Sequence, residues 1–197
     1  QEQSGLLIPS LEYDLVRADD VLFTRRGYSA SFRLQGAAEG AASDTTFLQA
    51  YVAARSVLPL GERGRLLLRG EYGATSSDDF SLLPPSLRFF NGGAQSVRGY
   101  GFEELSPTDP QGNLLGGEYM GTVSVEMDYL FYGNFGVAAF VDAGNASNDP
   151  GINVKTGAGI GLRYRTPIGM VRIDFAHPFD DPDSSFAFHI SLGPDLQ

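Results

Sequence analysis

The feature that most constrains the fold is a regular alternation of apolar and polar residues in the second half of the chain. From residue 118 to residue 131, one parity is apolar or small and the other is mostly polar: Tyr119, Gly121, Val123, Val125, Met127, Tyr129 and Phe131 against Glu118, Met120, Thr122, Ser124, Glu126 and Asp128. A period of two places the two sets on opposite faces of a β-strand. The sequence therefore predicts strands that have one apolar and one polar face.

The same alternation recurs along the chain and predicts eight or nine antiparallel strands. In the second half it continues through residues 135–143, 154–165, 171–176 and 186–192. In the first half it is noisier, at residues 28–35, 48–55 and 68–72, and it is weakest at 5–16. Strands of roughly this length, when tilted, cross a bilayer. We expect residues 1–197 to form a single all-β domain, an antiparallel transmembrane β-barrel.

Composition excludes several other classes of protein. No run of about 18 apolar residues is present, which excludes a transmembrane helix. The net charge of −10 argues against nucleic acid as a partner, because phosphate binding needs a basic surface. The chain has no cysteine, so disulfides and thiolate metal sites are excluded. Because no basic segment followed by an apolar one opens the chain, we expect any signal peptide to have been removed already.

The connections between the predicted strands alternate between short and long. Short ones lie at 25–27, 59–62, 132–134 and 166–169, and long ones at 36–45, 77–115, 144–153 and 178–184. Short turns on one side and long loops on the other are typical of outer-membrane barrels. A soluble β-sandwich also has short alternating strands. The barrel is favoured by charges and glycines on the polar face and by aromatic residues at strand ends: Tyr119, Tyr129, Phe131 and Tyr164.

Nothing in the sequence indicates an enzyme, a metal or a cofactor. There is no G-x-S-x-G motif, and the glycines at 157, 159 and 161 lack the spacing of a nucleotide site. They predict a strand whose bare polar face lets another segment lie close. His177 and His189 are interpreted as solvated or lumen-facing rather than as metal ligands. The acidic stretch 180–183 is interpreted as a solvated loop, with divalent ions at lipopolysaccharide as the weaker alternative.

One loop, at residues 77–115, is much longer than ordinary hairpin loops. At its centre Arg98 lies among glycines and aromatic residues, and two interpretations stay open. The loop is either exposed, or it folds inward so that Arg98 meets Glu126 and Asp142, which parity places on the polar side of the next two strands. Inside a narrow lumen, carboxylate partners would offset the desolvation of a guanidinium group.

Several motifs resemble those of a known family, the Omp85 superfamily of outer-membrane barrels. Residues 89–100, read as FFNGGAQSVRGY, are similar to the family's loop motif. Residues 140–144 (FVDAG) resemble its aromatic–V-D-x-G strand, and 157–176 resemble its last hairpin. Residues 20–28 resemble its periplasmic turn, without the usual proline at position 24. The ending, residues 188–196, is more similar to the translocation and assembly module barrels (TamA) than to BamA.

The resemblance implies roles for particular residues. The loop motif would anchor the loop in the lumen through Gly92, Gly93, Val97, Arg98, Gly99 and Tyr100. Glu126 and Asp142 would be its acidic partners in the lumen. The final strand would be both a lateral-gate strand and an assembly signal, through Phe186, Phe188, Ile190 and Leu192. An open strand edge can pair with the strand of a client protein.

The function implied is assembly or translocation of outer-membrane proteins in Gram-negative bacteria. Expected partners are outer-membrane lipid and lipopolysaccharide, client outer-membrane proteins, a periplasmic TamB-like protein and a second copy of the chain that completes the barrel. The chain supplies fewer strands than family barrels have, and no POTRA domain is present. Two alternatives therefore stay open: a small self-standing barrel that is structural or a narrow pore, and a truncated fragment of the insertase.

Overall fold

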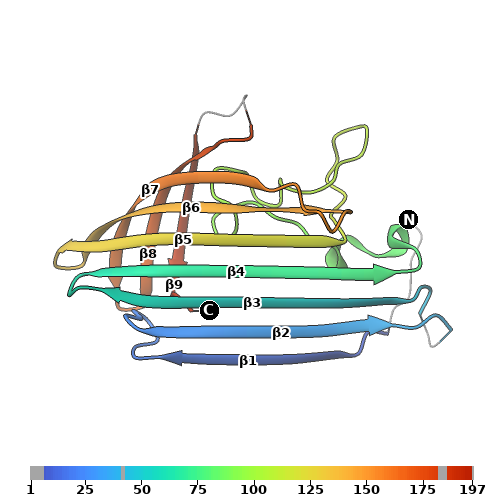
Figure 1. Ribbon diagram of the computed structural model, residues 1–197, viewed down its shortest axis with the longest axis horizontal. Helices are drawn as coiled ribbons and strands as arrows, with labels where there is room; N and C mark the ends of the chain where they lie inside the picture. The colour runs from blue at the N-terminus through green and yellow to red at the C-terminus, as the bar shows by residue number, and fades with distance from the viewer. Residues whose placement is uncertain (1–6, 41–42, 182–185, 197) are drawn as a thin grey trace.

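The structure is a computed structural model in which residues 7–40, 43–181 and 186–196 are described. Nine antiparallel strands form one sheet in chain order (Figure 1). They are β1 (Ser10–Ala18), β2 (Gly27–Ala37), β3 (Phe47–Leu60), β4 (Gly64–Ser77), β5 (Tyr119–Tyr132), β6 (Phe135–Ser147), β7 (Lys155–Thr166), β8 (Gly169–Pro178) and β9 (Ala187–Gly193). Two short 3-10 helices, η1 (Phe80–Leu82) and η2 (Pro85–Leu87), lie between β4 and β5. The all-β, antiparallel prediction is confirmed.

Neither of the two helices in the described residues is long and apolar enough to cross a membrane.

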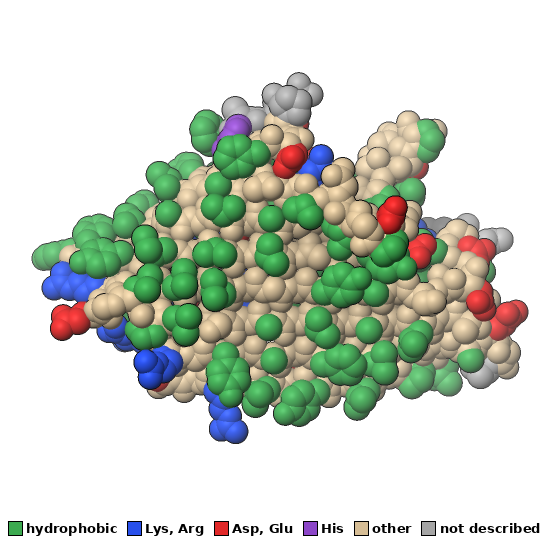
Figure 2. All heavy atoms as spheres, viewed as in Figure 1, with side chains coloured by type: hydrophobic (Ala, Val, Ile, Leu, Met, Phe, Trp, Pro, Cys, Tyr) green, Lys and Arg blue, Asp and Glu red, His purple; other side chains and the backbone are tan. Residues whose placement is uncertain are grey.

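The polarity of the sheet is the reverse of that in a soluble protein. On β5, Val125 and Met127 are 51% and 53% exposed, whereas Glu126 and Asp128 are 6% and 2% exposed. Apolar side chains cover the outward face of β2–β6 (Figure 2). Soluble proteins bury the apolar set and expose the charged one. A strand that faces lipid outside and a packed polar lumen inside has the arrangement seen here.

The sheet curves strongly, and its concave face, here called the lumenal face, holds the long loop. In Figure 1, β7 runs above β6, β8 and β9 lie behind the front strands, and the β4–β5 loop lies on that side. Within the loop, Phe89 bridges to Gly117 and Asn91 to Leu105. The loop has its own small apolar cluster, formed by the buried side chains of Val97, Tyr100 and Leu105. The inward course of the loop, one of the two open interpretations, is the one the structure adopts.

Short turns gather at one end of the sheet and long loops at the other (Figure 1). Gly61 and Gly133 have φ values of +64° and +54° in the β3–β4 and β5–β6 turns, a conformation that glycine adopts without steric cost. Near this end the rings of Phe135 and Tyr164 lie 4.6 Å apart, centroid to centroid. Aromatic side chains at a strand end suit the interface between lipid and water.

The observed strands differ from the predicted ranges by one to several residues, and the first and last strands are shifted along the sequence. Part of the expected first strand, 5–16, lies outside the described residues, and β1 runs from Ser10 to Ala18 because its pairing with β2 continues to Gly27. Phe186 precedes β9, which extends to Gly193 because Gly193 still pairs with Met170. Residues 182 and 183 of the acidic stretch also lie outside the described residues.

Candidate functional site

Arg98 of the loop is buried on the lumenal face and forms a bidentate ion pair with Asp142 of β6. Its Nε lies 2.7 Å from Asp142 Oδ2, and its Nη2 lies 3.0 Å from Oδ1. The backbone N–H of Arg98 also donates to Oδ2, at 3.1 Å. Such a bidentate pair fixes orientation as well as charge. Asp142 is 0% exposed, so Arg98 is the group that compensates its burial.

The same guanidinium group reaches two further carboxylates, Glu126 and Asp174. Arg98 Nη1 lies 2.6 Å from Glu126 Oε2 and 3.2 Å from Asp174 Oδ2. Arg163 of β7 binds both of these acids from the other side, at 2.7 Å from Glu126 Oε1 and 2.6 Å from Asp174 Oδ1. We use the name loop-anchor network for the five residues that these ion pairs join: Arg98, Glu126, Asp142, Arg163 and Asp174. It joins the loop to β5, β6, β7 and β8.

Strand parity and register bring these acids together. Glu126 and Asp142 lie on the buried parity of neighbouring strands, and Ser124 is the register partner of Asp142. The Ser124 hydroxyl donates to Asp142 Oδ1 at 2.6 Å. The guanidinium carbon of Arg98 lies 3.4 Å from the centroid of the Phe140 ring, a cation–π contact. Ser124 lies two residues before Glu126, and Phe140 lies two residues before Asp142, so all four side chains share the lumenal face.

The glycine face of β7 allows close packing, and at Gly157 the group that packs against it is the loop. A Cβ atom at Gly157 would overlap the carbonyl oxygen of Arg98, and one at Gly159 would meet the Phe140 ring at 2.6 Å. The sequence predicted that another segment lies close to this face, and the structure identifies that segment as the loop at Arg98. Any side chain at Gly157 would therefore compete with the docked loop.

The rest of the loop motif is held by backbone contacts. Gly99 has a φ of +107°, and its Cα packs against the backbone of His177 and Pro178 at the end of β8. The Tyr100 hydroxyl donates to the carbonyl of Thr156 at 3.4 Å and accepts from the backbone N–H of Asp180 at 3.3 Å. The remaining predicted motif residues, Gly92, Gly93 and Val97, are buried in the same turn.

Two further side chains, one from β4 and one from the loop itself, also hold the loop in place. Arg69 of β4 donates to the carbonyls of Gln95 and Ser96. The amide of Asn91 donates to Thr122 Oγ1 of β5 at 2.7 Å. The loop is therefore tied to β4 and β5 on one flank and to β6–β8 on the other. It crosses the lumenal face instead of standing at its rim.

A second ion cluster lies toward the short-turn end. Arg65 of β4 binds Asp128 at 2.5 Å and Asp195 at 2.6 Å, and Asp195 also binds Arg172 at 2.5 Å. Asp195 follows β9, so the chain turns onto the lumenal face after its last strand. Across the described residues, ion pairs on this face join seven arginines to seven carboxylates: Arg33, Arg55, Arg65, Arg69, Arg98, Arg163 and Arg172 with Glu12, Glu71, Glu126, Asp128, Asp142, Asp174 and Asp195.

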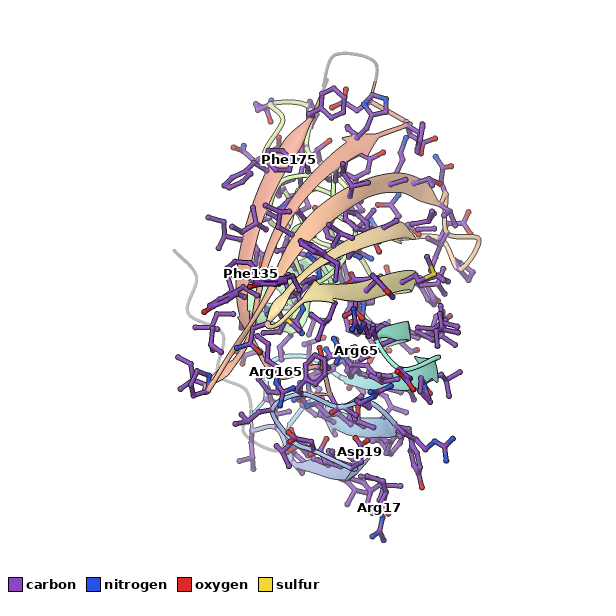
Figure 3. All side chains as sticks on the ribbon, turned by 90° about the vertical axis from the view of Figure 1, so that its left-hand side faces the viewer. Arg17, Asp19, Arg65, Phe135, Arg165 and Phe175 are labelled. Carbon is purple, nitrogen blue, oxygen red and sulfur yellow. The ribbon has the colours of Figure 1, made fainter. Side chains whose placement is uncertain are left out.

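The β1–β2 turn lies across this same end. The Phe23 ring lies 4.0 Å from the guanidinium carbon of Arg65 and 4.6 Å from that of Arg165. Figure 3 looks at this end, with Arg65 and Arg165 turned inward and Phe135 and Phe175 outward. The Asp20 side chain accepts from the backbone N–H groups of Phe23 and Leu22, and these bonds lower the pKa of Asp20. The turn is thus ordered over the lumenal face.

The predicted gate-strand residues lie on β9 and just before it. Phe188, Ile190 and Leu192 are exposed on the outward face of β9, and Phe186 is exposed just before the strand. The Phe188 ring lies 5.2 Å from that of Phe175 on β8. In the described part of the chain, β9 pairs with β8 alone and β1 pairs with β2 alone. The sheet therefore has two open edges.

Several residues of the site were not predicted as site residues, among them Arg163, Asp174 and Asp195. Arg163 and Asp174 occupy polar parity positions, a signal that was visible but that did not show how the two strands align. Asp195 lies beyond the last alternating segment, where the sequence has no pattern to interpret. The predicted residues Arg98, Glu126 and Asp142 do come together, whereas Phe186 and the β9 residues lie on the opposite face of the sheet.

Comparison with known proteins identifies the family. The Omp85 superfamily domain matches residues 6–195. "Outer membrane protein assembly factor BamA" of Nitratidesulfovibrio vulgaris is 30% identical over 162 residues, which are 76% of this chain and 20% of that protein. The chain thus spans about a fifth of that relative's length.

A solved structure shows the same fold. The crystal structure of Haemophilus ducreyi BamA lacking POTRA domains 1–3 matches with a TM-score of 0.76 and 21% identity, over 94% of this chain and 41% of that one. Both relatives are BamA proteins, so the likeness to TamA stays a prediction. Because the family match runs over nearly all of the chain and the fold agrees with it, the chain belongs to the Omp85 superfamily of outer-membrane β-barrel proteins.

Proposed function

We propose that the chain is the C-terminal barrel segment of a TamA-like insertase, which assembles or translocates other outer-membrane proteins. Membership of the family places it in the outer membrane of Gram-negative bacteria. The observation that carries the proposal is the edge of β9, whose only strand partner in the described residues is β8. This edge is the place where a client strand would be templated, at a lateral gate.

The chemistry of β9 suits that role. Soluble proteins protect open edges because unpaired N–H and C=O groups recruit other strands. On β9, Phe188, Ile190 and Leu192 face outward, so a client strand that pairs here would find lipid on the same side. Backbone hydrogen bonds would provide affinity, as in other forms of β-strand addition. Burial of the client's apolar face in lipid would drive insertion, without nucleotide or metal.

The loop-anchor network has a supporting role in this proposal. Arg98 would hold the loop on β5–β8 and keep the wall next to β9 in a single shape. Lipopolysaccharide would surround the outward face, and a TamB-like protein would meet the periplasmic end. A second copy of the chain, or the rest of a longer barrel, would cover the edge of β1.

Crosslinking from β9 tests the templating edge. A photoreactive residue at Ile190, in the membrane-embedded intact protein, should crosslink to a client barrel during its assembly. Val125 on β5 is the matched control, because it is also exposed on the outward face but its strand pairs on both sides. We expect client adducts at position 190 and none above background at position 125. Equal yields, or no adduct at either position, would reject templating at β9.

One observation favours the smaller, self-standing barrel. Arg65 donates to the backbone carbonyl of Thr24 at 2.6 Å and also binds Asp195. The β1–β2 turn and the residues after β9 therefore meet at the short-turn end, although their strands do not pair. Closure of this kind would suit a small barrel that works as a structural protein or narrow pore.

The native mass of the chain purified alone in detergent distinguishes the two functions. Because the sheet has two open edges, we expect a folded dimer, with heat-modified gel mobility as the sign of folding. A folded monomer would mean that the chain closes on itself, and it would favour the small barrel over the insertase.

A further inference from the structure

The last strand touches the loop motif through one side chain, His189. Its imidazole lies on the lumenal side of β9 and is half-buried. The backbone N–H of Gly99 donates to His189 Nε2 at 3.1 Å. Gly99 is the residue directly after Arg98, so this bond joins the loop-anchor network to the open-edged strand.

The chemistry of this bond depends on the protonation state of the imidazole. A nitrogen that accepts a hydrogen bond carries no proton, so the contact assigns the neutral ring with its proton on Nδ1. Imidazole is the side chain that gains a proton between about pH 8 and pH 5. A protonated ring has two N–H donors and no acceptor. The buried N–H of Gly99 would then have lost its partner, which is unfavourable.

The charged groups around His189 would let a protonated ring compete with Arg98 for a carboxylate of the loop-anchor network. Asp174 is its register partner on β8. The charges that act on the ring from the neighbouring elements are those of Asp174 on β8, Asp142 on β6 and Arg98 in the loop. Arg163 on β7 binds Asp174, and Arg172 lies two residues before it. The Arg98–Asp174 contact, at 3.2 Å, is the longest of the three ion pairs that Arg98 makes. An imidazolium that turned to Asp174 would therefore weaken the anchor as well as release Gly99.

We propose that His189 is a positioning residue that clasps the loop to β9 when neutral and releases it when protonated. The clasp is the Gly99–His189 hydrogen bond. The inference rests on the proposed function in one respect, because β9 matters only if its edge is the working edge. At pH values where His189 is neutral, the loop is hydrogen-bonded to β9 on the lumenal side. At lower pH, where His189 is protonated, β9 keeps its pairing with β8 but loses this hydrogen bond.

The mobility of the loop as a function of pH tests the clasp. Because the chain has no cysteine, a single Phe102→Cys change allows a nitroxide spin label to be attached at one defined position. Phe102 is 81% exposed and lies three residues after Gly99. In the intact protein in lipid vesicles, we expect the mobile fraction of the label to change from minor to major between pH 8 and pH 5.

Two glutamine variants identify the histidine responsible. In His189→Gln the amide oxygen still accepts but does not titrate, so the label should stay immobile at both pH values. His177→Gln is the control, because His177 is the chain's other histidine and its ring packs on Phe179 and Phe186. It should keep the wild-type pH response. If His189→Gln does not fold, as judged by heat-modified mobility, His189→Asn replaces it.

Three results would overturn the clasp: a flat wild-type profile, a pH step that survives in His189→Gln, or its loss in His177→Gln. The outcome is separable from that of the proposed function. A pH step without client adducts at Ile190 would remove the templating role and leave the clasp. Adducts with a flat label profile would remove the clasp alone.

Discussion

Arg98→Ala is expected to release the loop from the lumenal face and to lower the free energy of unfolding by about 3–5 kcal/mol, the usual effect of breaking a buried ion pair. The loop-anchor network holds two arginines and three carboxylates. Removal of Arg98 leaves Arg163 to compensate Glu126 and Asp174, and it leaves Asp142 buried without its ion-pair partner, although the Ser124 hydroxyl still donates to it. Urea unfolding in lipid vesicles would measure the loss. New protease cuts between residues 77 and 115 would show that the loop has been released.

Two variants serve as controls for this prediction. Arg88→Ala also removes a loop arginine, but its guanidinium contacts the carbonyls of Ser81, Leu83 and Leu115 and the ring of Phe80, and not a buried carboxylate. It should therefore lose much less stability. Arg98→Lys keeps the charge but not the bidentate geometry, so it should fall between Arg98→Ala and the wild type. An Arg98→Ala loop that resists protease as well as the wild type would show that Arg98 is not its anchor.

Gly157→Val is expected to have an effect of similar size by a different route. A Cβ at this position overlaps the carbonyl oxygen of Arg98, which is backbone and cannot turn aside. Overpacking usually costs about 1–3 kcal/mol, and a clash with backbone belongs at or above the upper end of that range. The loop must lift or β7 must shift, so protease cutting in the loop should rise together with the fall in stability.

The matched control for Gly157→Val is Ala158→Val. Ala158 is the next residue of β7 and has the opposite parity, so its side chain points away from the loop. This change should leave the loop resistant to protease. Equal damage from the two variants would mean that β7 is sensitive to valine in general, and the close approach of the loop would not explain the result.

Alternation was enough to predict the strands, because a period of two is a local property. Parity also placed Glu126 and Asp142 on the face where Arg98 now binds them. The choice between an exposed and an inward loop was beyond the sequence, because it depends on how far the sheet curves. Asp174 shows the same limit: its polar parity was visible, but its distance from Arg98 depends on the β7–β8 register and on the curvature of the wall.

Other contacts had no sequence signal at all. Asp195 lies after the last alternating residue, and nothing local indicates that the chain turns inward there. His189 was interpreted as solvated or lumen-facing, and the structure gives it a specific neighbour, the N–H of Gly99. That contact joins residues 90 positions apart in the sequence. Long-range pairs of this kind follow from packing, which no periodicity encodes.

The crossing of the lumenal face by two protein segments has a consequence for solute movement. The loop occupies the face from the long-loop end, and the β1–β2 turn crosses it at the other end with Phe23 held between Arg65 and Arg165. An ion that travelled along this face would have to displace protein as well as water. Permeation would then be limited by the rate at which the loop or the turn opens, and not by the width of the barrel.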